Sequence, residues 1–203
     1  MNTVCKKIRI SVLVSLIICI CLSCVNFDAK CEDLKSNVLR LHIIANSDSE
    51  EDQALKLKVR DAILLSNCAA FNNCTDIADA RAVAENNLDM YKTVAEQVIK
   101  ENGYDYSVSV GLCDTYFETR AYDTFTLPAG VYDALQIKIG AAKGKNWWCV
   151  MFPSLCVPAA SNAKLTDSVS QSTADIAERP QNYQIRFKIV EVFEFIKKNL
   201  SKL

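Results

Sequence analysis

The sequence predicts an α+β domain in which an antiparallel sheet of about four to five strands packs with three main helices, behind an N-terminal signal peptide. An uncharged apolar run over residues 10–22 follows a basic start. Apolar side chains then recur at helical spacing between residues 49 and 102, and from Tyr104 onward they alternate with polar ones. This change of period places helices and strands in separate parts of the chain.

The N-terminal residues have the features of a targeting segment. Lys6, Lys7 and Arg9 precede the apolar run, so we expect a signal peptide whose cleavage removes residues 1–24. An uncleaved anchor is the alternative, in which residues 8–25 contact a membrane. The segment contains three basic residues and no acid, so its removal changes the formal net charge from −1 to −4. This acidic balance argues against a nucleic acid as partner.

Export would place the chain in a compartment where disulfides persist, which makes its cysteines informative. Six of the ten cysteines lie beyond the targeting segment: Cys31, Cys68, Cys74, Cys113, Cys149 and Cys156. Cys149 and Cys156 flank a turn that contains Pro153, and we predict a disulfide between them. Beyond the targeting segment the chain has one histidine and no CxxC pair, so we predict no metal site. The remaining length favours a single domain over residues 34–203.

The pattern from residue 39 to residue 66 predicts a strand, a polar turn and a helix. Alternation over residues 39–45 puts Arg40 and His42 on one face of the strand, opposite Leu41. The turn that follows is rich in serine and acids, which suit a capping box and the positive end of a helix dipole. The box can form in two registers, from Ser47 or from Ser49. We predict the helix over residues 49–66.

The rest of the chain supplies two more helices and the remaining strands. A long helix is predicted over residues 75–102, and Gly103 suits its end. Short connections between the strands favour antiparallel pairing. The strands are expected within residues 106–112, 116–127, 131–139 and 146–152. Residues 159–182 are polar without an apolar period and are predicted to form a mobile excursion. The last helix, over residues 183–200, is expected to dock on its own sheet, with a partner or a membrane as the alternative.

Two polar segments are predicted to meet in one partner-binding patch. The first strand leads into the acidic turn, and the loop over residues 140–146 leads into two tryptophans, so charged groups would surround an aromatic anchor. The alternative is that the tryptophans belong to the core and that the turn only caps a helix. The candidate residues are Arg40, His42, Asn46, Asp48, Lys145, Asn146, Trp147 and Trp148.

The single histidine allows a second hypothesis, that of an exported enzyme. His42 could act as a base for a thiolate of Cys149 or Cys156, or could form an acid–base pair with Asp48 or Glu50. The structural interpretation is a half-buried histidine that is hydrogen-bonded to the acids of the following turn. We favour the structural interpretation and predict no catalytic residues.

Three sequence blocks resemble the stage II sporulation protein R family. They are RLHIIANSD at 40–48 with KLKVRD at 56–61, LPAGVYDAL at 127–135 with GKNWWCVMFPSLC at 144–156, and RFKIVE at 186–191. Val131 and Ser154 depart from the pattern, standing where an acid and a second proline are expected. Residues 159–182 carry no family signature.

This resemblance implies a signalling protein of endospore-forming bacteria that is not an enzyme. Such a protein is made in the forespore and secreted into the space between the forespore and mother-cell membranes. Its implied partner is a membrane-embedded aspartic protease of the mother cell, which it activates to process the precursor of sigma-E. No cofactor is implied.

Overall fold

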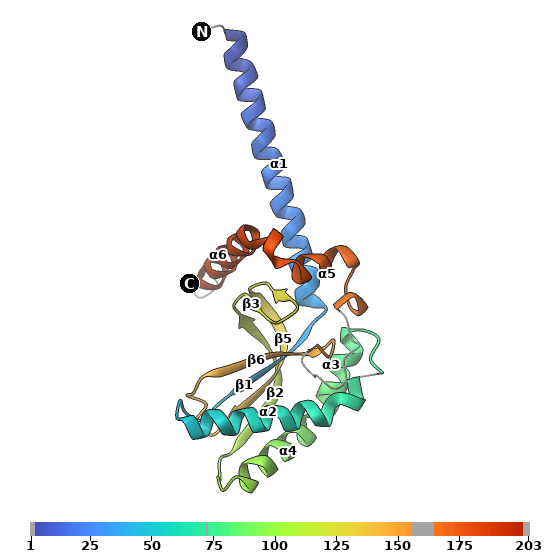
Figure 1. Ribbon diagram of the computed structural model, residues 1–203, viewed down its shortest axis with the longest axis vertical. Helices are drawn as coiled ribbons and strands as arrows, with labels where there is room; N and C mark the ends of the chain where they lie inside the picture. Colours follow the sequence, from blue (N-terminus) through green and yellow to red (C-terminus); the bar gives the residue numbers. More distant parts are fainter. Residues whose placement is uncertain (1–2, 72, 156–164, 201–203) are drawn as a thin grey trace.

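The computed structural model describes residues 3–71, 73–155 and 165–200, as an α+β domain from which one long helix projects (Figure 1). The helices in these ranges are α1 (Thr3–Ser36), α2 (Glu50–Phe71), α3 (Ile77–Asn86), α4 (Leu88–Glu101), α5 (Gln171–Glu178) and α6 (Gln184–Leu200), with short 3-10 helices η1 (Leu165–Asp167) and η2 (Pro180–Asn182). The strands are β1 (Leu39–Ile44), β2 (Val108–Phe117), β3 (Arg120–Ala121), β4 (Thr126–Leu127), β5 (Gly130–Ile139) and β6 (Asn146–Phe152).

The main sheet has four strands in the order β2-β5-β1-β6, while β3 and β4 form a separate two-stranded ribbon. Pairs β2–β5 and β1–β6 are antiparallel, but β1 and β5 are parallel, with His42 opposite Gln136. The predicted strand number is therefore confirmed, and the prediction of a wholly antiparallel sheet was wrong. The physical reason is that α2, α3, α4 and β2 intervene between β1 and β5, and a crossover of this length permits parallel pairing.

One face of the sheet packs on α2, α3 and α4. Leu41 and Ile43 of β1 are buried there with Val59 of α2 and Tyr91 of α4, in what we call the first core. The helix predicted over residues 75–102 is broken into α3 and α4, which corrects that prediction. The cause is Asn87, whose side-chain amide donates to the Val83 carbonyl at 2.7 Å and competes with the continuing helix. Helix α2 also continues beyond its predicted end.

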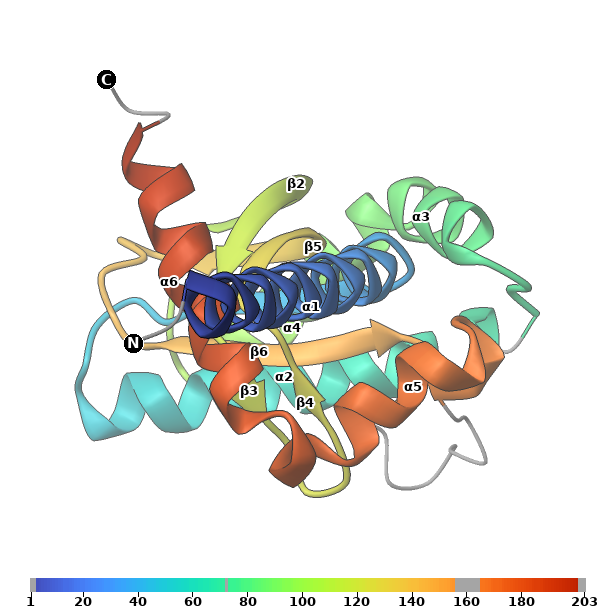
Figure 2. The ribbon, with the colours of Figure 1, turned by 90° about the horizontal axis from the view of Figure 1, so that it is seen from above.

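The opposite face of the sheet packs on the C-terminal part of α1 and on α5 and α6, as Figure 2 shows from above. Phe27 and Leu34 of α1 meet Tyr132 of β5 and Phe187 of α6 in this second core. Helix α5 lies within residues 159–182, the segment expected to form a mobile excursion, so this part of the segment is helical. Its buried side chains are Thr173, Ala174, Ile176 and Ala177, of which Ile176 alone is large and apolar. A helix this short with one large apolar side chain shows little apolar period in the sequence. Residues 156–164 lie outside the described ranges.

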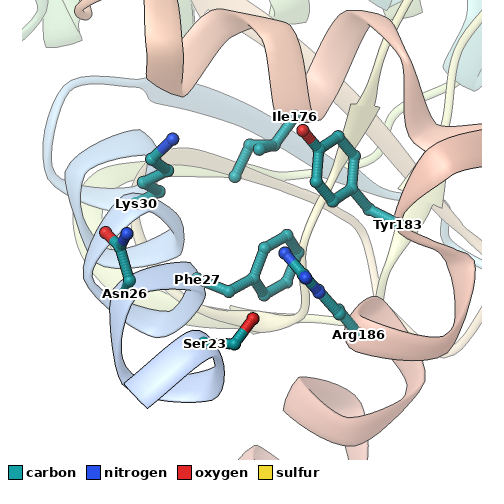
Figure 3. Close-up of a pocket in the computed structure, with 7 residues that line it drawn as sticks. All are labelled: Ser23, Asn26, Phe27, Lys30, Ile176, Tyr183 and Arg186. Atoms are coloured by element: carbon teal, nitrogen blue, oxygen red, sulfur yellow. The ribbon is translucent and has the colours of Figure 1, made fainter. Parts of the chain in front are cut away.

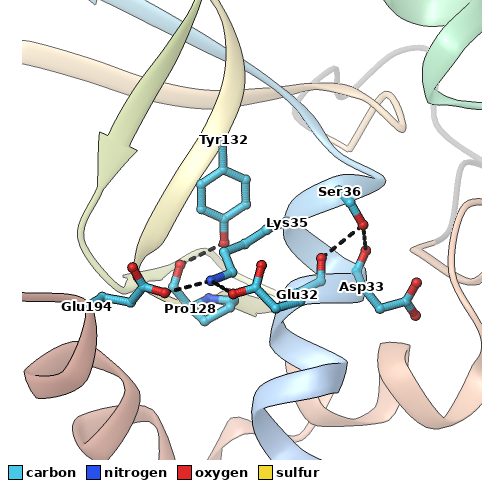
Figure 4. A network of polar contacts seen from close by, with 7 residues as sticks. All are labelled: Glu32, Asp33, Lys35, Ser36, Pro128, Tyr132 and Glu194. Atoms are coloured by element: carbon cyan, nitrogen blue, oxygen red, sulfur yellow. Dashed lines mark hydrogen bonds and ion pairs between the residues drawn. The ribbon is translucent and has the colours of Figure 1, made fainter. Parts of the chain in front are cut away.

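A buried ion pair joins the first and last helices (Figure 4). Lys35 Nζ lies 2.9 Å from Glu194 Oε1 and 2.7 Å from Glu32 Oε1, and the side chains of Lys35 and Glu194 are each only 5% exposed. Burial opposes the charge of Lys35, but its hydrogen bonds to both carboxylates raise its pKa above the ordinary value. The lysine stem passes Gly130, where an added Cβ would lie 2.3 Å from Lys35 Cδ, so the glycine makes room for this connection.

Helix α1 runs without interruption through the segment predicted to be a signal peptide and into the second core. Its outer part carries exposed apolar side chains, among them Leu13, Leu16 and Leu22, whereas Cys31 and Leu34 are buried. Within the described ranges, no helix meets the length and hydropathy that crossing a bilayer requires. Cleavage after residue 24 stays a prediction.

Candidate partner-binding surface

The polar turn after β1 is built around the start of α2. The Asp52 N–H donates to Ser49 Oγ at 3.2 Å, and α2 begins at Glu50. Ser49 therefore caps the helix, while its own N–H donates to Ser47 Oγ instead of to the Asp52 carboxylate that would complete the box. Glu50 and Glu51 also lie in the first turn, where the helix dipole favours negative charge.

The buried carboxylate of Asp52 organises the turn. It accepts hydrogen bonds from Ser47 Oγ at 2.6 Å and from Asn46 Nδ2 at 2.8 Å. Burial raises the pKa of Asp52, but the hydrogen bonds from Ser47, Asn46 and Tyr106 outweigh burial and lower the pKa below its ordinary value. The acid thus stays ionised as a structural acceptor.

The loop over residues 140–146 is bonded to this turn along its length. Backbone N–H groups of the loop reach oxygens of the turn: Ala141 to Asn46 Oδ1 at 2.9 Å, Lys143 to Asn46 O at 3.1 Å, Gly144 to Ala45 O at 3.0 Å and Lys145 to Asp48 Oδ1 at 2.6 Å. A Cβ added to Gly144 would lie 2.1 Å from Ser47 O, so the two segments approach as closely as backbone allows. We call residues 45–52 and 140–146 together the polar corner.

Lys56 connects α2 to the loop of the polar corner, a role that the sequence pattern did not indicate. Its Nζ donates to Gln53 Oε1 at 2.6 Å and to the Lys145 carbonyl at 3.0 Å, while its side chain is buried. Burial lowers the pKa of Lys56, and the positive charges of Lys145 and Arg60 act in the same direction, against the attraction of Asp48. From the sequence alone, a lysine between the leucines of a helix is expected on the surface, so the burial of Lys56 was not predictable.

His42 is 5% exposed and both of its ring nitrogens are engaged. Nε2 lies 2.8 Å from Asn146 Oδ1, and Nδ1 lies 3.0 Å from Gln136 Nε2, which fits a neutral ring that donates from Nε2 and accepts at Nδ1. Its ring stacks on Trp148 with centroids 4.0 Å apart. Burial lowers its pKa, as do Lys138 and Arg40, while the bond to Asn146 works against them. Its partners are therefore amides and not the predicted acids.

Arg40 lies on the same face of β1 as His42, as the alternation predicted, but it is fully buried. Its guanidinium carbon lies 3.8 Å from the ring centroid of Phe117 and 4.8 Å from that of Tyr132, and Nη2 donates to the Tyr122 hydroxyl. Within the described ranges, Nε and Nη1 have no hydrogen-bond partner. Arg40 thus belongs to the second core.

The two tryptophans lie on opposite faces of β6. Trp147 packs against the first core beneath Arg60, whose guanidinium carbon is 4.4 Å from a ring centroid, and Trp148 packs against the second core. Both side chains are half-buried, as is Asn46. The exposed candidates are Asp48, Lys145 and Asn146, all at the polar corner. The structure therefore brings the turn and the loop together but separates Arg40 and His42 from the exposed surface.

The structure tests the predicted dyad of His42 and Cys149, but it does not test the predicted disulfide between Cys149 and Cys156. Cys149 pairs with Leu41 in the register of β1 and β6 and faces the first core, whereas His42 faces the second core. A dyad of His42 and Cys149 is therefore not formed. Cys156 lies outside the described residues, so its disulfide with Cys149 stays a prediction. Among the residues that the structure describes, no group of three or more histidine, cysteine, aspartate or glutamate side chains could hold a metal ion.

Comparison with known proteins gives two matches. Residues 35–162 match the family model described as Stage II sporulation protein R. The Stage II sporulation protein R of Bacillus subtilis (strain 168) is 37% identical over 131 residues, which cover 64% of this chain and 58% of that protein. The aligned region thus spans less than two thirds of that relative. No solved structure shows a significant match.

Proposed function

The chain belongs to the stage II sporulation protein R family, and we propose that it acts as a secreted signalling protein of endospore formation. In this proposal the forespore exports the protein into the space between the forespore and mother-cell membranes. There it activates the membrane-embedded aspartic protease of the mother cell, which processes the precursor of sigma-E. Family membership supports the role in sporulation, and the secretion, the protease and the sigma-E step are the parts that we propose.

The observation that carries the proposal is the extent of the family match. Residues 35–162 contain all six described strands together with α2, α3 and α4, so the sheet, the first core and the polar corner belong to the region shared with the family. In the polar corner, exposed Asp48 and Lys145 sit on a backbone that is fixed by hydrogen bonds across two segments. A rigid, charged surface of this kind suits recognition of a partner protein, because few groups need ordering on binding.

An activator must bind the active arrangement of its protease more tightly than the inactive one, since a ligand shifts an equilibrium only by its differential affinity. This requirement needs contacts and no chemistry from the activator. The enzyme alternative has little support, because His42 is buried with both nitrogens bonded to amides and faces away from Cys149.

The test is processing of the sigma-E precursor in sporulating cells whose own stage II sporulation protein R gene is replaced by variants of this chain. Asp48→Asn with Lys145→Gln removes one acidic and one basic exposed charge of the polar corner, those of the two charged candidates, and keeps the acceptor for the Lys145 N–H. We expect immunoblots to show normal accumulation of this variant and reduced processing. The matched control, Lys92→Gln with Glu96→Gln, removes an exposed pair on α4 and should process normally.

Two results would contradict the proposal. Unchanged processing by the polar-corner variant would remove the recognition surface, and unchanged processing in cells that lack the protein altogether would remove the signalling role. Co-purification of the wild-type chain with the protease, lost in the polar-corner variant alone, would support direct contact.

A further inference from the structure

Helix α6 is apolar on two opposite sides, and an exposed Phe195 lies between them. Phe187 and Val190 point into the second core, on the side where Glu194 meets Lys35. The opposite side carries six apolar side chains, each at least 49% exposed, which we call the outer stripe: Ile185, Ile189, Val192, Phe193, Ile196 and Leu200. A contiguous exposed patch of this kind marks an interaction surface.

The buried ion pair fixes which side of α6 faces outward. Rotating the helix to bury the outer stripe would expose or separate Lys35 and Glu194, and a buried charge that loses its partner is strongly unfavourable. At helical spacing, Arg186 and Lys197 lie along one edge of the outer stripe and Lys188 lies along the other. An apolar stripe with basic residues at its edges is the pattern of a helix that lies in a membrane interface.

The position of α1 indicates what covers the outer stripe. Figure 1 shows α1 projecting from the side of the domain that carries α5 and α6, with α6 running across its direction, and Figure 2 looks down on this side. In the uncleaved chain, exposed apolar residues surround the outer part of α1, including Ile10, Leu13 and Ile18. A protein groove covers one face of a helix, whereas lipid can surround it, so a helix that is apolar all round favours lipid.

A cavity of about 80 Å³ lies where α1 meets α5 and α6 (Figure 3). It is lined by Ser23, Asn26, Phe27, Lys30, Ile176, Tyr183 and Arg186. Lys30 Nζ bonds the Ser172 carbonyl at 3.1 Å, and the Arg186 guanidinium carbon lies 5.8 Å from the Phe27 ring centroid. In the described ranges no ion pair joins Lys30 or Arg186 to a carboxylate. Two such cations beside a hydroxyl and an amide suit a phosphate group.

We propose that the outer stripe of α6 docks on an anionic lipid bilayer, with Lys30 and Arg186 holding the phosphate of a lipid headgroup at the cavity. The apolar stripe supplies burial in the interface, and the basic residues favour an anionic leaflet. The surface lies outside residues 35–162, so it is separate from the region that matches the family model and from the polar corner. It would hold the domain on the membrane while leaving the polar corner free for a partner.

The test uses the full chain reconstituted into phosphatidylcholine vesicles with or without phosphatidylglycerol. Phe193→Trp places a reporter on the outer stripe, and Glu191→Trp places one on the same helix away from the stripe. We expect lipids with brominated acyl chains to quench the first reporter and not the second, beyond the signal of the native tryptophans. Because α1 is the same in both reporter variants, quenching at position 193 relative to position 191 reports the docking of α6.

Charge removal tests the headgroup site. Each basic side chain near an anionic surface contributes about fivefold to binding, so Lys30→Gln with Arg186→Gln should lower the ratio of docked to undocked α6 about thirtyfold. The effect should disappear on vesicles without phosphatidylglycerol. A matched removal of two charges on α4, Lys92→Gln with Lys100→Gln, should leave quenching unchanged.

Three results would overturn the proposal. Equal quenching of the two reporters would show that α6 has no preferred membrane face. Absent quenching, with cross-links between outer stripes of two chains, would assign the stripe to self-association. Stabilisation of the detergent-solubilised chain by inorganic phosphate, lost in the Lys30 and Arg186 variant and without quenching in vesicles, would assign the cavity to a soluble anion.

Discussion

Lys35 Nζ and Glu194 Oε1 lie 2.9 Å apart in the interior, although 159 residues separate them in the chain. Lys35 has a second carboxylate partner in Glu32, which is 55% exposed, whereas within the described ranges Lys35 is the cation that pairs with Glu194. Lys35→Met should therefore cost about 3–5 kcal/mol of unfolding free energy, because it leaves a buried carboxylate without its cation. Glu194→Gln should cost clearly less, because Lys35 keeps Glu32.

Urea unfolding of the two variants measures this asymmetry. The double variant Lys35→Met with Glu194→Leu serves as the control, and it should recover most of the loss, since apolar replacements of both partners leave no unpaired charge. Equal losses in the two single variants would contradict the assignment of Glu32 as the second partner.

The lowered pKa of His42 predicts a dependence of stability on pH. Because the folded pKa lies below the unfolded value of about 6.5, the unfolded chain takes up the proton first, and stability falls as the pH drops through this range. Arg40 and Lys138 face the ring and add to the effect by repelling the imidazolium. Asp52, with its lowered pKa, loses its contribution only below about pH 4 and leaves the histidine window separate.

We expect the free energy of unfolding to decrease between about pH 7.5 and about pH 5.5 in the wild-type chain, and His42→Gln to remove most of that slope. Urea titrations at the two pH values measure it, with His42→Gln also assayed for processing of the sigma-E precursor. A variant that folds normally but abolishes activity would revive the enzyme alternative. A slope identical to that of the wild-type chain would contradict the assigned protonation.

Two glycines provide a matched pair for the polar corner. A methyl group at Gly144 would lie 2.1 Å from Ser47 O, a backbone atom that is fixed by its neighbours, whereas a methyl group at Gly111 meets nothing within 4 Å. Gly144→Ala should lower the free energy of unfolding by about 1–3 kcal/mol, as overpacking does. Gly111→Ala should be neutral or stabilising by about 0.4–1 kcal/mol. Thermal unfolding of both variants measures the two changes in stability.

The tryptophans are expected to act through stability. Trp148 stacks on His42 and lies edge-on to Phe117 with ring centroids 4.6 Å apart, so Trp148→Ala should destabilise the fold, by less than the roughly 3–5 kcal/mol of a fully buried tryptophan. Trp148→Phe keeps a stacking ring and should retain most of the stability. If Trp148→Ala kept its urea midpoint and lost signalling, the tryptophan would be a partner contact, as the patch hypothesis holds.

The disulfide between Cys149 and Cys156 is tested by peptide mapping without reduction, on protein isolated from sporulating cells. We expect one cross-linked peptide that joins the end of β6 to the residues after it. Alkylation of both thiols in the unreduced protein would end the prediction. A chain expressed in a reducing cytosol is the control, since disulfides do not persist there.

The strands and the helix after β1 were predictable because each has a local cause. Alternation defined β1, β5 and β6, and a serine before a run of acids defined the start of α2. The parallel pairing of β1 with β5 was not predictable, because it depends on where the crossover of α2, α3 and α4 returns the chain. Helix α5 was missed because its burial against α1 depends on a tertiary contact and not on its own period.

The segments that form the candidate site were predictable from the sequence, but the burial of its individual side chains was not. The meeting of the acidic turn with the loop over residues 140–146 followed from their positions at strand ends. The burial of Arg40 did not follow, because its cover comes from Phe117, Tyr122 and Tyr132 on other segments. A guanidinium held by aromatic rings looks the same in sequence as one that is exposed to solvent.

The two cores differ in how much of the chain each one needs, and this sets an order of assembly. The first core draws its buried residues from Leu39 to Phe152, so it can close once β6 is available. The second core extends from Phe27 to Val190 and includes a helix at each end of the described chain. During synthesis or translocation from the N-terminus, the α2–α4 side therefore completes first, and the face of Arg40 and Tyr132 stays open until α6 arrives. Helix α6 is therefore the last element to pack, and its packing completes the second core.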